Sequence, residues 1–101
     1  MTFLTSNQSL NDGFDAVFLC VAEAYPSPIV YEWFKDGNLI LSDPHGQFYI
    51  DREGLRIRLR AKQLTKNSAG QYSCSGRNIL GTGKRKSTFL AVNCKCCYCC
   101  Y

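Results

Sequence analysis

The segment from Leu55 to Lys62 alternates without a break between apolar and basic side chains. Its apolar positions are Leu55, Ile57, Leu59 and Ala61, and its basic positions are Arg56, Arg58, Arg60 and Lys62. Successive side chains of a β-strand point to opposite faces of a sheet, so this segment is predicted to be a strand with one core face and one cationic face. Such a strand requires a second apolar layer packed against it.

Similar short runs, separated by turn residues, continue along most of the chain. They predict strands over residues 2–6, 15–22, 30–35, 47–51, 71–77 and 84–92, with turns or loops at 11–13, 36–38, 42–46, 67–70 and 78–81. The expected inward residues are Ala16, Phe18, Cys20, Ala22, Tyr31, Trp33, Tyr72, Cys74, Thr88, Leu90 and Val92. No segment is left for a long helix, so the sequence predicts an all-β fold.

The length and composition fit one globular domain. The chain has 101 residues, of which 46% are hydrophobic and 20% charged, and these values exclude a disordered or collagen-like chain. No run of 18 apolar residues is present, so we expect no direct membrane insertion. Residues 1–13 lack the features of an export signal. Because the first predicted strand begins almost at Met1, we expect the chain to be a piece of a longer protein.

The charges are divided along the chain. All eight acidic residues lie at or before Glu53, where only Lys35 and Arg52 oppose them, so residues 1–53 carry a net charge of −6. Residues 54–101 contain ten basic residues and no acid, a net charge of +10. In a compact domain the two halves interleave, so two separate poles are not expected.

The cysteines are divided as sharply. Cys20 and Cys74 stand alone in the body of the chain, and the other five lie between residues 94 and 100. A disulfide between two inward cysteines on facing sheets, covered by an indole ring, would fill and hold the core of a sandwich of this size. Trp33 lies 13 residues after Cys20, and Tyr72 lies two residues before Cys74.

These residues resemble the immunoglobulin superfamily, and within it the I-set type. The motifs that carry the resemblance are Cys20, Tyr25-Pro26-Ser27-Pro28, Trp33-Phe34-Lys35-Asp36-Gly37, Leu59-Arg60-Ala61, Ala69-Gly70-Gln71-Tyr72-Ser73-Cys74, Asn78 with Gly81, and Leu90-Ala91-Val92. They run in the family's order through nearly the whole body. One departure is Ser68, where the family has an aspartate that pairs with an arginine; residues 47–51 contain no arginine.

The resemblance implies a Greek-key β-sandwich of two antiparallel sheets over residues 1–93. It implies a disulfide between Cys20 and Cys74, a core around Phe18, Trp33, Leu59 and Tyr72, and a hydrogen bond from the Tyr72 hydroxyl to the upstream backbone. Residues 94–101 would form a cysteine-rich tail, unstructured or artefactual. Soft-metal ligation and palmitoylation are alternative interpretations of this tail, but its cysteine spacing does not fit a zinc site.

The resemblance further implies a protein-binding module of a cell-surface adhesion molecule or receptor ectodomain. Its partner would be a protein, such as another immunoglobulin-like domain in a homophilic or heterophilic pair. One alternative is an intracellular structural module of a muscle or cytoskeletal protein, in which the cysteines would stay reduced. A second alternative is a module that binds a sulfated polysaccharide of the heparan-sulfate type.

Two predicted surfaces correspond to these hypotheses. Exposed aromatic residues with polar neighbours predict a binding face at Glu32, Phe34, Ser73 and Phe89. The outward stripe Arg56, Arg58, Arg60 and Lys62, extended by Lys66, predicts a polyanion site. Against the polyanion site, Asp15 and Asp51 on neighbouring strands would neutralise the stripe, and its stems would cover Val17, Leu19 and Val21. Binding of nucleic acid is not expected, because no aromatic residues that could stack on nucleobases lie between the basic residues.

Asn7-Gln8-Ser9 is a candidate N-glycosylation sequence. No enzymatic activity and no cofactor are expected, because the sequence combines no nucleophile, base and orienting group. The single histidine, His45, lies with Asp43 in a segment that turn chemistry explains. Gly81-Thr82-Gly83-Lys84 is predicted to be a hairpin turn rather than a phosphate loop.

Overall fold

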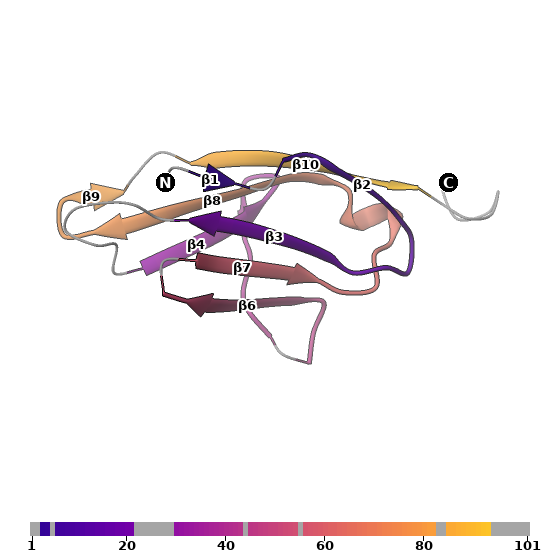
Figure 1. Cartoon of the computed structure of the whole chain (residues 1–101), viewed down its shortest axis with the longest axis horizontal. Helices are drawn as coiled ribbons and strands as arrows, with labels where there is room; N and C mark the ends of the chain where they lie inside the picture. Colours follow the sequence, from indigo (N-terminus) through magenta and orange to yellow (C-terminus); the bar gives the residue numbers. More distant parts are fainter. Residues whose placement is uncertain are drawn as a thin grey trace.

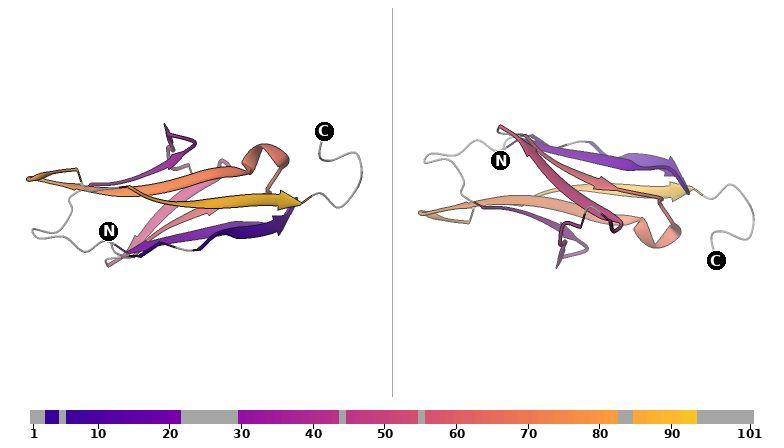
Figure 2. Two further views of the ribbon diagram at one scale, coloured as in Figure 1. Left: turned by 90° about the horizontal axis from the view of Figure 1, so that it is seen from above. Right: turned by 90° about the horizontal axis from the view of Figure 1, so that it is seen from below.

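The computed structural model describes residues 3–4, 6–21, 30–43, 45–54, 56–82 and 85–93. These residues form two β-sheets that face one another, and the edge-on views show both layers (Figure 2). The predicted all-β sandwich is confirmed. Residues 22–29, with the Tyr25-Pro26-Ser27-Pro28 motif and Ala22, lie outside the described residues, as do Leu55, Lys84 and the tail 94–101.

Sheet A contains four strands and sheet B contains six (Figure 1). Sheet A has the order β1 (Phe3–Leu4), β3 (Ala16–Val21), β7 (Arg56–Ala61) and β6 (Phe48–Glu53). Sheet B has the order β2 (Gln8–Asn11), β10 (Lys86–Asn93), β8 (Gly70–Asn78), β4 (Val30–Lys35) and β5 (Asn38–Leu39), and β9 (Gly81–Thr82) also pairs with β8. A short 3₁₀ helix, η1 (Lys66–Ser68), precedes β8.

The core fills the space between the sheets. Phe18, Trp33, Leu59 and Tyr72 are fully buried, and the Phe18 and Tyr72 rings stack with their centroids 4.5 Å apart. A disulfide joins Cys20 on sheet A to Cys74 on sheet B. Every second residue of β3 and β7 is buried, which is the alternation expected from the sequence.

The N-terminal segment differs from the prediction of a single strand over residues 2–6. β1 pairs with β3 in sheet A, and the chain then crosses to sheet B as β2, which pairs with β10. The β2–β10 pair is parallel, so the expectation that both sheets are wholly antiparallel is wrong for this pair. The predicted strand 47–51 is observed as β6 (Phe48–Glu53), and the last predicted strand begins at Lys86 and ends at Asn93.

The hairpin between β4 and β5 is closed by Asp36 and Gly37. Both have positive φ, 50° and 85°, and this combination matches the right-handed twist of the flanking strands. The Asp36 carboxylate accepts a hydrogen bond from the Gln71 backbone N–H at 2.9 Å. It also forms an ion pair with Lys35 at 3.1 Å. The pKa of Asp36 is lowered by the Gln71 N–H first and by Lys35 second.

The corner before β8 contains the departure from the family pattern. The Ser68 hydroxyl accepts a hydrogen bond from Gln47 Nε2 at 2.8 Å and another from the Thr65 N–H at 3.0 Å. A neutral pair between Gln47 and Ser68 therefore connects the two segments where the resemblance leads one to expect a salt bridge. The Tyr72 hydroxyl donates to the Ser68 carbonyl at 2.5 Å.

Candidate binding surfaces

Exposed apolar side chains gather on sheet B and its connections. Among the described residues, eight large hydrophobic side chains are exposed, and five of them belong to sheet B or to the turn that joins β8 and β9: Val30, Leu39, Ile79, Leu80 and Phe89. The other three are Phe14, Val17 and Leu41, and Leu41 lies in the connection from β5 to β6 of sheet A. Exposed apolar side chains that gather on one layer of a domain are typical of a protein contact site.

The predicted binding face is only partly exposed. Phe89 is 55% exposed, but Phe34 is 8% exposed, so the expectation that Phe34 faces solvent is wrong. The Arg85 guanidinium lies 3.7 Å from the centroid of the Phe34 ring and covers it. Ser73 is also buried, and its hydroxyl is hydrogen-bonded to that of Ser87 at 2.9 Å. Glu32 is half-buried, opposite Ser75 on β8.

The turn between β8 and β9 adds an apolar tip that sequence reasoning had treated only as a turn. Ile79 and Leu80 are 77% and 76% exposed. The Leu80 N–H donates to the Asn78 side-chain oxygen at 2.8 Å, which fixes the turn. Turns usually carry Gly, Asn, Asp or Ser, so two aliphatic residues at this position were the available signal in the sequence.

The basic stripe on sheet A is partly neutralised by its own sheet. Arg58 makes a two-point contact with Asp51, with Nε to Oδ1 at 3.0 Å and a terminal nitrogen to Oδ2 at 3.1 Å. This pairing raises the pKa of Arg58. Arg56 lies opposite Glu53 in the β6–β7 register, and the Lys62 ammonium lies 5.9 Å from the Tyr49 ring centroid.

Asp15 and the aliphatic residues Val17 and Leu19, which were expected to neutralise and lie under the stripe, make different contacts. Asp15 accepts a hydrogen bond from the Gln63 backbone N–H at 2.9 Å. Val17 and Leu19 line a hollow of about 210 Å³ together with Asp51, Glu53, Arg56 and Arg58. Acidic and apolar side chains thus lie among the arginines, which weakens the case for a polyanion site. Lys66 lies apart from the stripe in η1 and is exposed.

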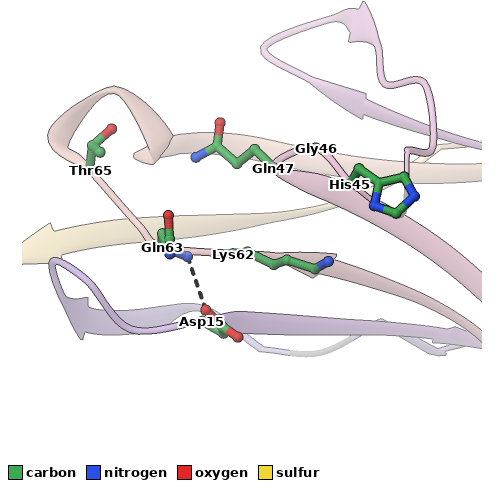
Figure 3. Close-up of a pocket in the computed structure, with 7 residues that line it drawn as sticks. All are labelled: Asp15, His45, Gly46, Gln47, Lys62, Gln63 and Thr65. Carbon is green, nitrogen blue, oxygen red and sulfur yellow. Dashed lines mark hydrogen bonds between the residues drawn. The ribbon is translucent and has the colours of Figure 1, made fainter.

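A second hollow lies beside His45 (Figure 3). It has a volume of about 570 Å³ and is lined by Asp15, His45, Gly46, Gln47, Lys62, Gln63 and Thr65. The Asp43 carboxylate accepts a hydrogen bond from the His45 backbone N–H at 3.0 Å, which is the predicted turn chemistry. Within the described ranges, no group of three His, Cys, Asp or Glu residues could hold a metal ion.

Asn7 lies immediately before β2, and its side chain is exposed. Its Oδ1 accepts hydrogen bonds from Thr88 Oγ1 at 3.1 Å and from the Phe89 backbone N–H at 3.0 Å. The candidate glycosylation residue is therefore held against β10. No helix in the part of the chain described here is long and apolar enough to span a bilayer.

Comparison with protein families shows which family the chain belongs to. Residues 1–78 match the family model described as immunoglobulin domain. The chain belongs to the immunoglobulin domain family. This confirms the resemblance drawn from the cysteine, tryptophan and tyrosine motifs. Domains of this family are generally protein-binding modules rather than enzymes.

Relatives at about one-third identity support the same assignment. The chain is 33% identical to chicken (Gallus gallus) basigin over 75 residues, which cover 72% of this chain and 19% of basigin. It is 34% identical to mouse (Mus musculus) protein turtle homolog A over 93 residues, which cover 86% of this chain and 7% of that protein. The chain thus spans a small part of the length of these relatives.

Solved structures of immunoglobulin domains superpose closely on this chain. A three-domain titin structure, I67–I69, is similar with a TM-score of 0.75 and 28% identity, and the match covers 88% of this chain and 30% of that one. The titin M10–obscurin-like 1 Ig complex is similar with a TM-score of 0.79 and 22% identity, covering 90% and 89% of the two chains. The second likeness concerns the fold alone.

Proposed function

We propose that this immunoglobulin domain is a protein-binding module of a cell-surface adhesion molecule or receptor ectodomain, with another immunoglobulin-like domain as its partner. The contact surface is the outer face of sheet B together with the β8–β9 turn. The observation that carries the proposal is that five of the eight exposed large hydrophobic side chains among the described residues belong to this sheet or to its β8–β9 turn. The centre of a protein interface is apolar and depleted of charge.

Sheet A presents a different outer surface. It carries charged side chains of both signs, and Arg58 is already held by Asp51 at two points. A partner docking there would have to displace or desolvate these charges, which is costly unless it supplies new pairs. Sheet B carries more of the exposed apolar side chains, and this difference favours sheet B as the contact face.

The disulfide supports the extracellular setting over the intracellular one. The Cα atoms of Cys20 and Cys74 are 6.7 Å apart, within the range that a disulfide spans. Disulfides persist in oxidising compartments and are rare in the cytosol. Measuring the mass of the native protein under alkylation, before and after reduction, tests this point. Two free body thiols in the native protein would favour an intracellular structural module.

The partner proposal is tested by binding to a panel of immunoglobulin-domain ectodomains, with this chain included as its own candidate partner. Phe89→Ser and Leu80→Ser are expected to weaken binding by about 30-fold or more, the size of an interface hot spot. Phe14→Ser is the matched control, because Phe14 is 52% exposed and lies between β2 and β3. Binding that Phe14→Ser abolishes and the sheet B variants retain would contradict the proposal.

A further inference from the structure

Asn7 and Phe89 are neighbours across the edge of sheet B. β2 is the edge strand beside β10, and the parallel register places Gln8 opposite Leu90. One step back along both strands brings Asn7 beside Phe89. Both side chains are exposed, and the ring of Phe89 is 55% accessible to solvent.

Two hydrogen bonds fix the direction of the Asn7 amide. The Phe89 backbone N–H can only donate, so the atom that it contacts at 3.0 Å must be the Asn7 oxygen. Thr88 Oγ1 donates to the same oxygen at 3.1 Å. Both bonds use the oxygen, so Nδ2 is not the atom that holds the side chain against β10. The orientation of this amide therefore follows from the backbone donor.

Asn7 begins the sequence Asn-Gln-Ser, in which Ser9 completes a glycosylation acceptor. Ser9 is exposed and accepts a hydrogen bond from Asn93 Nδ2 at 2.8 Å. The motif therefore lies at the surface, beside an exposed aromatic ring that the packing of the described residues leaves uncovered.

We propose that Asn7 carries an N-linked glycan whose first sugar packs against the ring of Phe89. The donor is an oligosaccharide linked to a lipid diphosphate. A bond forms between Asn7 Nδ2 and the anomeric carbon, the bond between that carbon and the diphosphate oxygen breaks, and the lipid diphosphate leaves as the amide loses one proton. The product keeps Oδ1 and one N–H, so both hydrogen bonds to β10 are retained.

The hydrogen bond to β10 places the glycan beside the residue that carries this ring. The Asn7 oxygen lies 3.0 Å from the Phe89 backbone nitrogen, so a sugar on the same amide begins next to Phe89. Sugar C–H groups pack favourably on an aromatic face. A glycan in this position removes Phe89 from protein contact. The glycan rests on the extracellular setting in the proposed function, and its effect on protein contact rests in addition on the proposed role of sheet B.

The glycan is tested with the full 101-residue chain secreted from eukaryotic cells behind an export leader. Ser9→Thr keeps the acceptor sequence, and Ser9→Ala removes it while leaving Asn7 and its two hydrogen bonds in place. Intact mass is expected to show an oligosaccharide on the wild-type and Ser9→Thr chains and none on Ser9→Ala. Secreted, folded Ser9→Thr without an oligosaccharide would overturn the proposal.

The packing on Phe89 is tested by hydroxyl-radical oxidation followed by peptide mapping. Oxidation of Phe89 is expected to fall by about twofold in the glycosylated chain, because a sugar on the ring covers one of its two faces. Phe14, which is 52% exposed and lies beyond the opposite end of β2 from Asn7, is the internal control. Enzymatic removal of the glycan from the folded wild-type chain should restore the oxidation. Equal oxidation of Phe89 with and without the glycan would overturn the packing.

The two proposals fail in different measurements. If the glycan protects Phe89 but no immunoglobulin domain binds the Ser9→Ala chain, the proposed function fails and the glycan inference stands. If the Ser9→Ala chain binds a partner and Phe89 is equally oxidised in both forms, the proposed function stands and the glycan inference fails.

Discussion

Removal of the Tyr72 hydroxyl tests the corner that precedes β8. In the Tyr72→Phe variant the ring still fills the space beside Phe18, but the hydrogen bond to the Ser68 carbonyl at 2.5 Å is lost. Because Tyr72 is fully buried, the carbonyl loses its hydroxyl partner without gaining water. The expected loss in the free energy of unfolding is about 2 kcal/mol. For a domain of this size, that lowers the melting temperature by about 8–16 °C.

Tyr31→Phe is the matched control, because it makes the same chemical change in a different environment. The Tyr31 hydroxyl is buried and has no hydrogen-bond partner among the described residues. Its removal is therefore expected to leave the free energy of unfolding unchanged or to raise it. Urea unfolding of both variants, with the disulfide intact, gives the comparison. Equal losses in the two variants would refute the argument that the Ser68 carbonyl is the decisive partner.

The pH dependence supplies a second readout of the same hydroxyl. Burial first, and the charge of Asp36 second, raise the pKa of Tyr72 above its ordinary value of 10.0. A raised pKa in the folded state means that stability is fully present below pH 10 and is lost as the pH rises above it. Tyr72→Phe should show a shallower alkaline loss than the wild-type chain. An identical slope above pH 10 would contradict the assignment.

Three further predictions concern the segments around this corner. Gly70→Ala should lower stability by about 1–3 kcal/mol, because Gly70 has φ 149° and an added Cβ would lie 2.7 Å from the Asp36 carboxylate oxygens; thermal unfolding measures the loss. The lowered pKa of Asp36 predicts a contribution that is present above pH 3.8 and lost as the pH falls below it. Asp36→Asn keeps an acceptor for the Gln71 N–H and should flatten the acid limb of a pH–stability curve. A double-mutant cycle with Gln47→Ala and Ser68→Ala should give a coupling energy of about 0.5–1.5 kcal/mol, and zero coupling would mean that the pair is only a contact.

Much of the fold follows from local patterns in the sequence. The alternation in β3 and β7 depends only on which residues are apolar, and it predicted the buried positions Phe18 and Leu59. The hairpin at Asp36-Gly37 was predictable because few residues tolerate positive φ at both central positions. These features are determined within a few residues, so neighbouring strands do not alter them.

The features that the sequence did not predict depend on residues far apart in the chain. Alternation does not say which strand lies beside β2, so the crossing to sheet B and its parallel pairing with β10 were not foreseen. Phe34 occupies an outward position on β4, but Arg85 covers it across 51 residues of sequence. The hydrogen bond between Gln47 and Ser68, which stands where the family has a salt bridge, likewise could not be predicted without knowing how the corner packs against residue 47.

The outward side chains of the two sheets differ in chemistry, and this difference indicates which sheet is the contact face. On sheet A the outward residues of β7 are arginines, of which Arg58 is paired with Asp51 and Arg56 lies opposite Glu53 on β6. On sheet B, Arg85 covers only Phe34, and Phe89 remains open. Covering an exposed aromatic ring removes apolar surface from water and so lowers the free energy. A protein partner and a glycan on Asn7 are the two candidates on this face, and because both need the same ring, occupancy of one should exclude the other.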